Sequence, residues 1–494
     1  MTLGSARTLA ALLEAEGPVD DLPDGTGVTF QRARVRPGDI LFAWRGSAGH
    51  AIDRADEALA AGAAYIVSDV VHPRGLRVTD PKAALTAVGR EARSRLRAPV
   101  IGITGSAGKT TVKAMAAAAL EARATPGNYN TPPGLTQTMF AAVIEDERAS
   151  PTTSPGTGPT SRPALSPLVL ELGIDHPGEM AELLALTRPE HAVVTTIGAS
   201  HLSALGSIEA VAREKTALLA AASGVRLVGS GAAPFVSSEL LATCTVVRVV
   251  AEPGASEPTG PVDGHADQAD GHPEQVVGVI AGTREGAATV HATGLGADVR
   301  FTLPWTSPAM IENALLALTL ATRLGRPFDA ALDGLRKVVL EPGRLQWRRL
   351  AGALLLDDSY NANPASADVA LHALRAAPRP WVAFLGDMLE LGDVSRDAHR
   401  LLGEATRDLD MVVFVGPESR AALAGNPKAL HRDDATQARD LVAGVPAGAT
   451  VLVKGSRGMQ MERVVEELLH RFGPEGTSDH LSTEALPSPA EATS

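Results

Sequence analysis

The stretch Gly102-Ile103-Thr104-Gly105-Ser106-Ala107-Gly108-Lys109-Thr110-Thr111 decides the fold, because an apolar run enters it and an alanine-rich segment leaves it. The run from Pro99 to Ile103 has the length of a buried strand, and the segment from Val112 has the composition of a helix. A loop of small residues between a strand and a helix lets consecutive backbone N–H groups surround an oxyanion, and the helix adds its positive N-terminal end. A lysine and a threonine at the end of such a loop can reach phosphate and magnesium. The stretch therefore predicts a site for a nucleoside triphosphate.

The loop departs from the strict phosphate-loop pattern, which places a glycine six positions before the lysine. Ile103 occupies that position, so the match is to the shorter Gly-x-x-Gly-Lys-Thr form. A tight turn without a ligand is the alternative interpretation of the loop alone. The residues predicted to surround the nucleotide phosphates are Gly105, Ser106, Ala107, Gly108, Lys109, Thr110 and Thr111.

Composition and charge exclude several classes of protein. A chain of 494 residues is long enough for about three domains, and 45% hydrophobic with 21% charged residues is ordinary for a globular protein. The formal charge of −12 and an aromatic content of 3% disfavour a nucleic-acid partner. The single cysteine, Cys244, excludes an internal disulfide and a cysteine-based metal cluster. Because no targeting segment and no apolar run of about 18 residues is present, we expect a cytoplasmic protein without a membrane span.

Short apolar runs recur between helical stretches, which predicts an α/β fold with a mostly parallel sheet. Polar side chains directly follow five of these runs. Ligands of open parallel sheets bind at this carboxyl end of the strands. Any one such strand end could be an ordinary turn, but five together favour a common cleft. The five ends carry Glu171 and Gly173, Gly198 and His201, Asp357 to Asn361, Gly386 and Asp387, and Lys454 to Arg457.

Composition also divides the chain into domains. Residues 1–98 carry their own pattern of strands and helices, and the phosphate loop opens the next domain at residue 99. A predicted helix from Asn313 to Leu324 stops at Gly325, so we place the second boundary there. The third domain then covers 326–472, and residues 473–494 form a polar, disordered tail. Two further polar segments, 149–167 and 252–275, are predicted to be solvated insertions.

Three later stretches, in this order, resemble the Mur ligase family and within it the MurF type. They are Asp357-Asp358-Ser359-Tyr360-Asn361-Ala362-Asn363-Pro364, Leu385-Gly386-Asp387-Met388-Leu389-Glu390-Leu391-Gly392 and Lys454-Gly455-Ser456-Arg457-Gly458-Met459. Sister ligases that add a diamino acid look different at the first two stretches. The resemblance covers about residues 30 to 470.

The resemblance implies a three-domain α/β architecture: an N-terminal domain for the UDP-linked substrate, a central P-loop ATPase domain and a C-terminal Rossmann-like domain. It implies ATP-dependent addition of D-alanyl-D-alanine to UDP-N-acetylmuramoyl-tripeptide, through an acyl phosphate, in peptidoglycan precursor synthesis. The implied cofactors are ATP and Mg²⁺, the partners are these small molecules, and the protein is expected to be a monomer.

The resemblance also implies roles for individual residues. Lys109, His201 and Lys215 match catalytic positions. The implied magnesium ligands are Thr110, Glu171, His201 and Lys215. Beyond the loop, Asn313, Arg344 and Asp358 match nucleotide contacts. The implied substrate contacts are Asn128, Asn130, Thr131, Asn361, Asn363, Lys454, Ser456 and Arg457.

Lys215 follows His201 at the spacing of relatives whose lysine is carbamylated by CO₂. A carbamate would remove a positive charge beside the metal and present oxygens, which Mg²⁺ prefers. The alternative is a solvated lysine on a helix predicted from Ser207 to Ala222.

The chain departs from the family pattern at four places, one of which is the loop Gly46-Ser47-Ala48-Gly49-His50, shorter than the family's Gly-His loop. The family's Asp-Ser/Thr-Arg before the Pro-Gly-Asp turn is absent, so Arg32 and Arg34 are candidates for diphosphate binding or merely a basic surface pair. Ala309-Met310 stands where relatives carry a histidine–asparagine pair near the adenine, and Met310 could pack on a purine face. Thr196 stands where asparagine is common. These changes keep two alternatives open: another Mur-like amino-acid ligase, or an inactive nucleotide-binding homologue.

Overall fold

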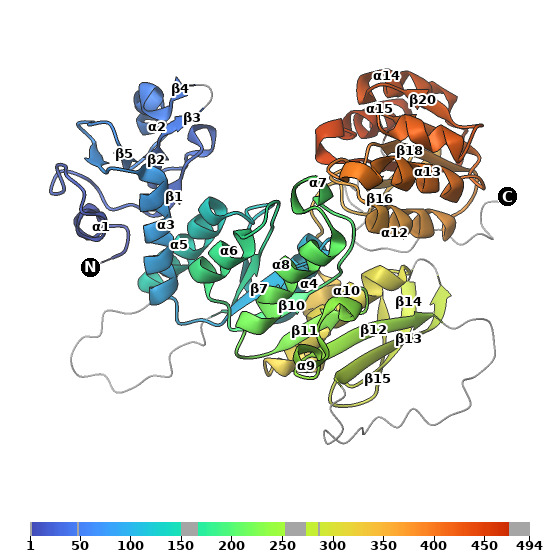
Figure 1. Ribbon diagram of the computed structural model, residues 1–494, viewed down its shortest axis with the longest axis horizontal. Coiled ribbons are helices and arrows are strands. Elements are labelled where there is room, and N and C mark those ends of the chain that lie inside the picture. Colours follow the sequence, from blue (N-terminus) through green and yellow to red (C-terminus); the bar gives the residue numbers. More distant parts are fainter. Residues whose placement is uncertain (1, 47–48, 150–165, 252–272, 285–286, 474–494) are drawn as a thin grey trace.

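The computed structural model describes residues 2–46, 49–149, 166–251, 273–284 and 287–473, which form three lobes in chain order (Figure 1). Each lobe is built around its own sheet, and most strand pairs are parallel, as the α/β pattern predicts. The predicted tail, apart from its first residue, and most of both predicted insertions lie outside the described residues.

The N-terminal lobe contains a parallel four-stranded sheet in the order β1-β2-β5-β6. The aromatic rings of Phe42 and Tyr65, which belong to two of these strands, are buried. The helix α3 begins where the Asp80 carboxylate accepts hydrogen bonds from the backbone N–H groups of Lys82 and Ala83. The main elements are α1 (Ala6–Leu13), β1 (Gly27–Thr29), β2 (Asp39–Ala43), α2 (Ala55–Ala60), β5 (Tyr65–Ser68), β6 (Gly75–Arg77) and α3 (Pro81–Arg95).

The middle lobe contains a nine-stranded sheet in the order β15-β14-β13-β12-β11-β10-β7-β9-β8, with β14 and β15 antiparallel to their neighbours. Its strands are β7 (Val100–Thr104), β8 (Arg123–Ala124), β9 (Leu168–Glu171), β10 (His191–Val194), β11 (Arg226–Gly229), β12 (Thr245–Ala251), β13 (Glu274–Arg284), β14 (Ala287–Thr293) and β15 (Val299–Leu303). Its helices are α4 (Lys109–Leu120), α5 (Pro132–Ala149), α6 (Glu179–Thr187), α7 (Leu202–Leu205), α8 (Ile208–Ala221), α9 (Ser238–Leu241), α10 (Pro308–Arg323) and α11 (Phe328–Arg336).

Helices cover both faces of the parallel part of this sheet, so its strands are buried on both sides. Alternation along β10 shows the two cores: Val193 packs with α4 and α10, whereas Ala192 and Val194 pack with α5, α6 and α8. The second core continues into the N-terminal lobe, where α3 packs against α5. The first two lobes are therefore joined by one apolar cluster.

The helix α11 lies beyond the predicted boundary at residue 325, yet its residues Ala331, Leu332 and Leu335 belong to the core formed by α4 and α10. The glycine that ends α10 permits a turn, and the chain then returns to the same sheet. We propose that the third lobe begins after α11, near residue 343.

The C-terminal lobe contains a six-stranded sheet in the order β16-β17-β21-β18-β19-β20, antiparallel only between β16 and β17. The helices α12 and α13 cover one face, and α14 and α15 cover the other. Its main elements are β16 (Gln346–Leu350), β17 (Ala353–Asp358), α12 (Pro364–Arg375), β18 (Trp381–Gly386), α13 (Ser395–Ala405), β19 (Met411–Val415), β20 (Leu430–Arg432), α14 (Ala435–Arg439), β21 (Ala449–Lys454) and α15 (Glu462–Phe472). This lobe lies over the end of the middle sheet that carries α7 (Figure 1).

Candidate active site

The loop between β7 and α4 has the backbone that a phosphate cradle needs, because two of its positions favour glycine strongly. Gly105 has φ 151°, and a Cβ there would lie 2.0 Å from Thr195 Oγ1. Gly108 has φ 82° and caps α4, and a Cβ there would lie 2.9 Å from Asn313 Oδ1. The Lys109 ammonium folds back over the loop and donates to the Gly105 carbonyl at 2.7 Å. Asn313 therefore lies beside the loop, and its contact with the nucleotide stays a prediction.

Two of the predicted loop amides are already bonded within the protein. Ser106 N–H donates to the Thr196 carbonyl at 2.8 Å, and Ala107 N–H donates to Thr196 Oγ1 at 3.1 Å. Thr196 therefore holds the loop in shape. The N–H groups at the start of α4 have no acceptor within the helix, so they are the donors left for an anion.

Glu171, at the end of β9, lies beneath the start of α4 and is 2% exposed. Its carboxylate accepts hydrogen bonds from Thr110 Oγ1 at 3.2 Å and Asn130 Nδ2 at 3.3 Å. Burial by itself would raise the pKa of Glu171, but the nearby charges of Lys113, Lys109 and Arg344 hold it below its ordinary value. Glu171 is therefore an ionised carboxylate facing the loop.

Lys113 is a site residue that the sequence did not indicate. It lies one helical turn after Lys109 and is 3% exposed. Its ammonium donates to the Gly127 carbonyl at 2.5 Å and lies 3.1 Å from Glu171 Oε2 and 3.2 Å from Glu341 Oε1. It therefore neutralises Glu171 and fastens the segment that leads to the C-terminal lobe.

His201 and Lys215 both lie within electrostatic reach of Lys109. His201 precedes α7 with φ 54°, and its Nδ1 lies 3.2 Å from Asp175 Oδ1 and 2.6 Å from Glu390 Oε2. Burial and the Lys109 charge lower the pKa of His201 although both carboxylates oppose them. The predicted metal ligands thus form two pairs, Thr110 with Glu171 and His201 with Lys215, which share Lys109 as a charged neighbour.

Lys215 is completely buried, so the interpretation as a solvated surface lysine is wrong. Its Nζ has no hydrogen-bond partner within the described residues. Burial, reinforced by the charge of Lys109, lowers its pKa well below the ordinary value, and Asp175 and Glu214 only partly oppose this. A buried amine without an ion-pair partner, whose neutral form is favoured by burial, is a candidate reactive group.

The C-terminal lobe contributes directly to the loop. Asn363 caps α12 with its Oδ1, and its Nδ2 donates to the Ser106 carbonyl at 3.1 Å. The Arg344 guanidinium stacks on the Tyr360 ring at 4.1 Å, and its Nε has no hydrogen-bond partner within the described residues. The charge of Arg344 acts on both Lys109 and Glu171.

Other residues predicted for substrate or nucleotide have partners of their own. Lys454 and Asp358 form a buried pair in which Lys454 Nζ lies 2.5 Å from Asp358 Oδ2, and Lys454 also donates to the Asn361 backbone carbonyl at 2.8 Å. Burial raises the pKa of Asp358 although Lys454 opposes it. Ser456 Oγ accepts from Leu389 N–H at 2.9 Å. Four of the predicted residues are exposed: Asn128, Thr131, Asn361 and Arg457. Arg457 pairs with Glu462.

Two residues discussed from the sequence lie away from the loop. Met310 is 4% exposed within the apolar core of α10, so it does not present a surface to a purine in this structure. Asp387 is fully buried and accepts from the backbone N–H groups of Ser419 at 2.7 Å and Glu418 at 3.2 Å. The Asp387 carboxylate, at the end of β18, therefore caps a 3-10 helix and does not face the common cleft that the sequence predicts.

A cavity of about 810 Å³ lies between the N-terminal lobe and α5 of the middle lobe. Arg34 lines it and donates to Tyr129 Oη at 3.0 Å, and its guanidinium lies 5.6 Å from the Tyr129 ring centre. Arg36 and Arg123 also line it, whereas Arg32 is paired with Glu57 outside it. The structure thus separates the two candidate arginines.

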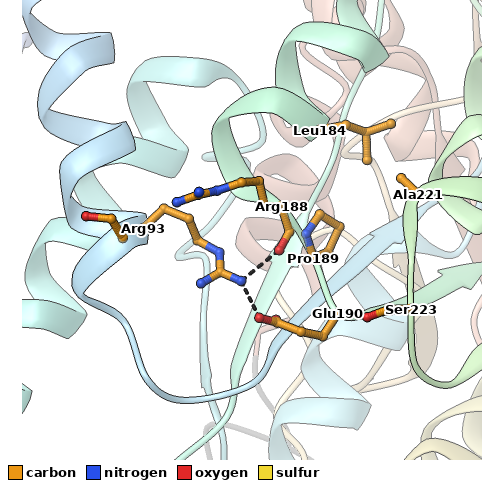
Figure 2. Close-up of a pocket in the computed structure, with 8 residues that line it drawn as sticks. Arg93, Leu184, Arg188, Pro189, Glu190, Ala221 and Ser223 are labelled. Atoms are coloured by element: carbon orange, nitrogen blue, oxygen red, sulfur yellow. Dashed lines mark hydrogen bonds and ion pairs between the residues drawn. The ribbon is translucent and has the colours of Figure 1, made fainter.

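A second cavity, of about 630 Å³, lies at the amino end of the middle sheet, opposite the phosphate loop (Figure 2). Arg93 reaches from α3, donates to the Arg188 carbonyl at 2.7 Å and pairs with Glu190. Glu190 in turn accepts from Val100 N–H at 2.7 Å, at the start of β7. These contacts hold α3 against the middle sheet. The residues in the figure therefore have a structural role.

Comparisons with known proteins agree with this geometry. Residues 103–229 match the Mur ligase middle domain, and residues 343–457 match the Mur ligase, glutamate ligase domain. The chain is 32% identical over 467 residues to the UDP-N-acetylmuramoyl-tripeptide–D-alanyl-D-alanine ligase of Escherichia coli, covering 89% of this chain and 93% of that relative. It is 28% identical to the ligase of the same name from Bacillus subtilis, covering 90% and 93%.

Solved structures show the same architecture. MurF from Acinetobacter baumannii superposes with a TM-score of 0.73 at 23% identity, covering 94% of this chain and 98% of that chain. MurF ligase from Thermotoga maritima in complex with ADP gives a TM-score of 0.69 at 25% identity, covering 90% and 98%. Within the described residues, no helix combines the length and apolar character needed to cross a bilayer.

Proposed function

The chain belongs to the Mur ligase family, and from this premise we propose that its site joins UDP-N-acetylmuramoyl-tripeptide to D-alanyl-D-alanine with the energy of ATP, in peptidoglycan precursor synthesis. The observation that carries the proposal is the meeting of the phosphate loop with Asn363 of the C-terminal lobe. That contact joins the nucleotide-binding loop to the Asn361-Ala362-Asn363-Pro364 stretch, which distinguishes this type from its sister ligases.

The residues around the loop fit ATP and Mg²⁺. The free amides at the start of α4, the Lys109 ammonium and the Arg344 guanidinium suit a polyphosphate. Thr110 and Glu171 would supply oxygen ligands, as Mg²⁺ requires, and His201 and Lys215, both within electrostatic reach of Lys109, are candidates for a second ion. The described residues hold no cluster of three His, Cys, Asp or Glu, which agrees with an ion that takes its other ligands from phosphate and water. Bound there, magnesium would neutralise charge on the transferring phosphoryl group.

The chemistry proceeds in two displacements. A terminal carboxylate oxygen of the tripeptide attacks the γ-phosphorus and ADP leaves, which gives an acyl phosphate. The amine of D-alanyl-D-alanine then attacks the acyl carbon, loses a proton, and phosphate leaves with the carboxylate oxygen. Lys109 and the loop amides hold the negative charge, and the C-terminal lobe excludes water that would hydrolyse the intermediate.

Lys215 is proposed to carry a carbamate. Its buried, unpartnered amine favours the neutral form, whose nitrogen can attack CO₂ and release a proton to solvent. We test this with Lys215→Ala, assayed with and without short-chain carboxylic acids. Activity that is lost and then restored by the acid supports the carbamate, and activity that survives the substitution rules it out.

The cavity beside Arg34 is proposed to take the UDP moiety. Three arginines, Arg34, Arg36 and Arg123, line it together with Asp39 and Glu145, and Arg34 is the candidate contact for the diphosphate. Tyr129 belongs to the same loop as Asn128 and Asn130. A monomeric state and a cytoplasmic location remain predictions.

Phosphate release from ATP tests the whole proposal. It is measured with UDP-N-acetylmuramoyl-tripeptide, with D-alanyl-D-alanine, with both, and with neither. Full release only with both supports the proposed function. Release with a single amino acid in place of the dipeptide supports another Mur-like ligase, and no release under any condition supports an inactive nucleotide-binding homologue.

A further inference from the structure

The hydroxyl of Ser456 joins three stretches of the C-terminal lobe that are far apart in the sequence. Its Oγ accepts a hydrogen bond from Leu389 N–H at 2.9 Å and donates one to the Ala362 carbonyl at 3.3 Å. The backbone N–H of Ser456 also donates to the Asp387 carbonyl at 3.0 Å. Ser456 is 4% exposed, so these bonds are shielded from solvent. The three stretches that carry the family resemblance therefore meet at one buried serine.

The order of the sheet explains this meeting. β21 lies between β17 and β18 and runs parallel to both, so the loops that follow the three strands leave the same edge of the sheet side by side. Ser456 precedes the 3-10 helix Arg457–Met459, a position at which a serine hydroxyl commonly accepts from a backbone N–H of its own helix. It makes no such bond. The hydroxyl bonds the two neighbouring loops instead.

The loop after β17 contacts the phosphate loop directly beyond its bond to Ser456. Ala362 accepts from the Ser456 hydroxyl, and the next residue, Asn363, donates from Nδ2 to the Ser106 carbonyl at 3.1 Å. Asn363 is buried and its Oδ1 caps α12, so the side chain has little freedom of its own. Its place over the phosphate loop therefore depends on where the backbone of Ala362 is held.

The loop after β18 contacts α7 in the same way. Leu389 donates to the Ser456 hydroxyl, and the next residue, Glu390, accepts at its carbonyl from Ser203 N–H at 3.2 Å. Gly392 lies against α7 as well, because a Cβ on it would be 3.4 Å from Ser203 Cα. Both contacts with the middle lobe thus come one residue after a backbone group that Ser456 holds.

We infer that Ser456 is a positioning residue that sets two contacts of the C-terminal lobe in register, one on the phosphate loop and one on α7. The inference rests on the proposed function only in that these contacts serve phosphoryl transfer. It differs from the substrate contact that the resemblance implies for Ser456. A serine hydroxyl has one proton, and here that proton is given to the Ala362 carbonyl, so none is left for a ligand.

Ser456→Ala removes both side-chain bonds. Its matched control is Ser419→Ala, because Ser419 is a buried serine whose Oγ donates to a carbonyl of its own lobe, that of Gly416 at 2.9 Å. For Ser456→Ala we expect kcat to fall about 10- to 100-fold, as when reacting groups are misplaced by about 1 Å, whereas Ser419→Ala should keep the wild-type kcat. Thermal unfolding shows whether each variant is folded. Ser456→Cys keeps the shape with a weakly bonding thiol, and it takes the place of Ser456→Ala if that chain does not fold.

A double-mutant cycle with Asn363→Ala tests whether Ser456 acts through the contact with the phosphate loop. If it does, Ser456→Ala lowers kcat much less in the Asn363→Ala chain than in the wild-type chain, because the contact that it positions is already lost. A direct substrate contact would instead give factors that multiply, and would raise KM for one substrate alone. Either of these results would overturn the inference.

A second readout does not require turnover. Energy transfer between dyes on Glu239→Cys and Lys428→Cys, at exposed positions of the middle and C-terminal lobes, reports the separation of the lobes with ADP and Mg²⁺ present. We expect less energy transfer with Ser456→Ala than with the wild-type chain or with Ser419→Ala. An unchanged kcat, or equal energy transfer in all three chains, would overturn the inference. A wild-type chain that forms no dipeptide-extended product contradicts the proposed function instead, and energy transfer then still decides the role of Ser456.

Discussion

Replacement of Lys113 by methionine is expected to destabilise the middle lobe strongly. The lysine is 3% exposed, and its ammonium lies 3.1 Å from Glu171 Oε2 and 3.2 Å from Glu341 Oε1. Methionine fills a similar volume but leaves Glu171, itself 2% exposed, without its nearest positive charge. Removing one partner of a buried ion pair costs about 3 to 5 kcal/mol. At about 2 to 4 °C per kcal/mol for a domain of this size, the lower figure corresponds to a fall in Tm of roughly 6 to 12 °C.

The pH dependence gives a second signature. In the wild-type chain the pKa of Glu171 is below its ordinary value, so this carboxyl stabilises the fold above its unfolded pKa, and that contribution is lost as the pH falls through the folded pKa. Without Lys113, burial acts with less opposition and raises the folded pKa. The gap in stability between the two proteins should therefore widen from about pH 4, near the ordinary pKa of glutamate, to neutrality.

Differential scanning calorimetry across this pH range measures both effects. Lys428→Met, at an exposed lysine of the C-terminal lobe, is the matched control and should melt with the wild-type chain. A Lys113→Met protein that melts within about 1 °C of the control at neutral pH, far less than the loss of a buried pair requires, would refute the role assigned to this lysine.

Three further substitutions and one control test other parts of the site. Gly105→Ala places a Cβ 2.0 Å from Thr195 Oγ1 at φ 151°, so we expect ATP affinity by calorimetry to fall about 10-fold or more; unchanged affinity would mean that the loop adapts. Arg34→Ala should raise KM for the UDP-linked substrate about 10-fold through loss of a charge-assisted contact, while KM for ATP stays constant; an equal rise in both would place Arg34 elsewhere in the mechanism. Asn363→Ala removes both the cap of α12 and the contact with the phosphate loop, so the free energy of unfolding should fall by about 0.5 to 2 kcal/mol and kcat should fall as well. Ser366→Ala removes only the other half of the capping box, so it should lower stability and leave kcat unchanged.

Local patterns predicted the strands, the phosphate loop and the α/β class, because each depends on residues that are close in the chain. Glu171 was found because it directly follows an apolar strand. Lys113 is not predicted as a site residue because a lysine on an alanine-rich helix usually faces solvent. Its position four residues after Lys109, on the same side of the helix, is the sequence feature that could have indicated it. The lobe to which α11 belongs depends on the core against which it packs. The residues that end α10 carry no information about that packing.

Contacts between lobes were beyond local patterns. Glu390 and His201 come from different sheets, and only the meeting of the C-terminal lobe with α7 brings them together. Asp387 shows the opposite case, since a polar residue at a strand end was predicted to face the cleft but caps a helix of its own lobe. Arg32 and Arg34 are alike in sequence, and only the cavity and Glu57 distinguish them.

The central claim is that a carboxylate of the tripeptide is activated by transfer of the γ-phosphoryl group. The direct measurement uses tripeptide substrate labelled with ¹⁸O in its terminal carboxylate, with ATP, Mg²⁺ and D-alanyl-D-alanine, followed by mass analysis of the phosphate. One ¹⁸O atom in each phosphate released during amide formation is the predicted result. Amide product accompanied by unlabelled phosphate would contradict the claim.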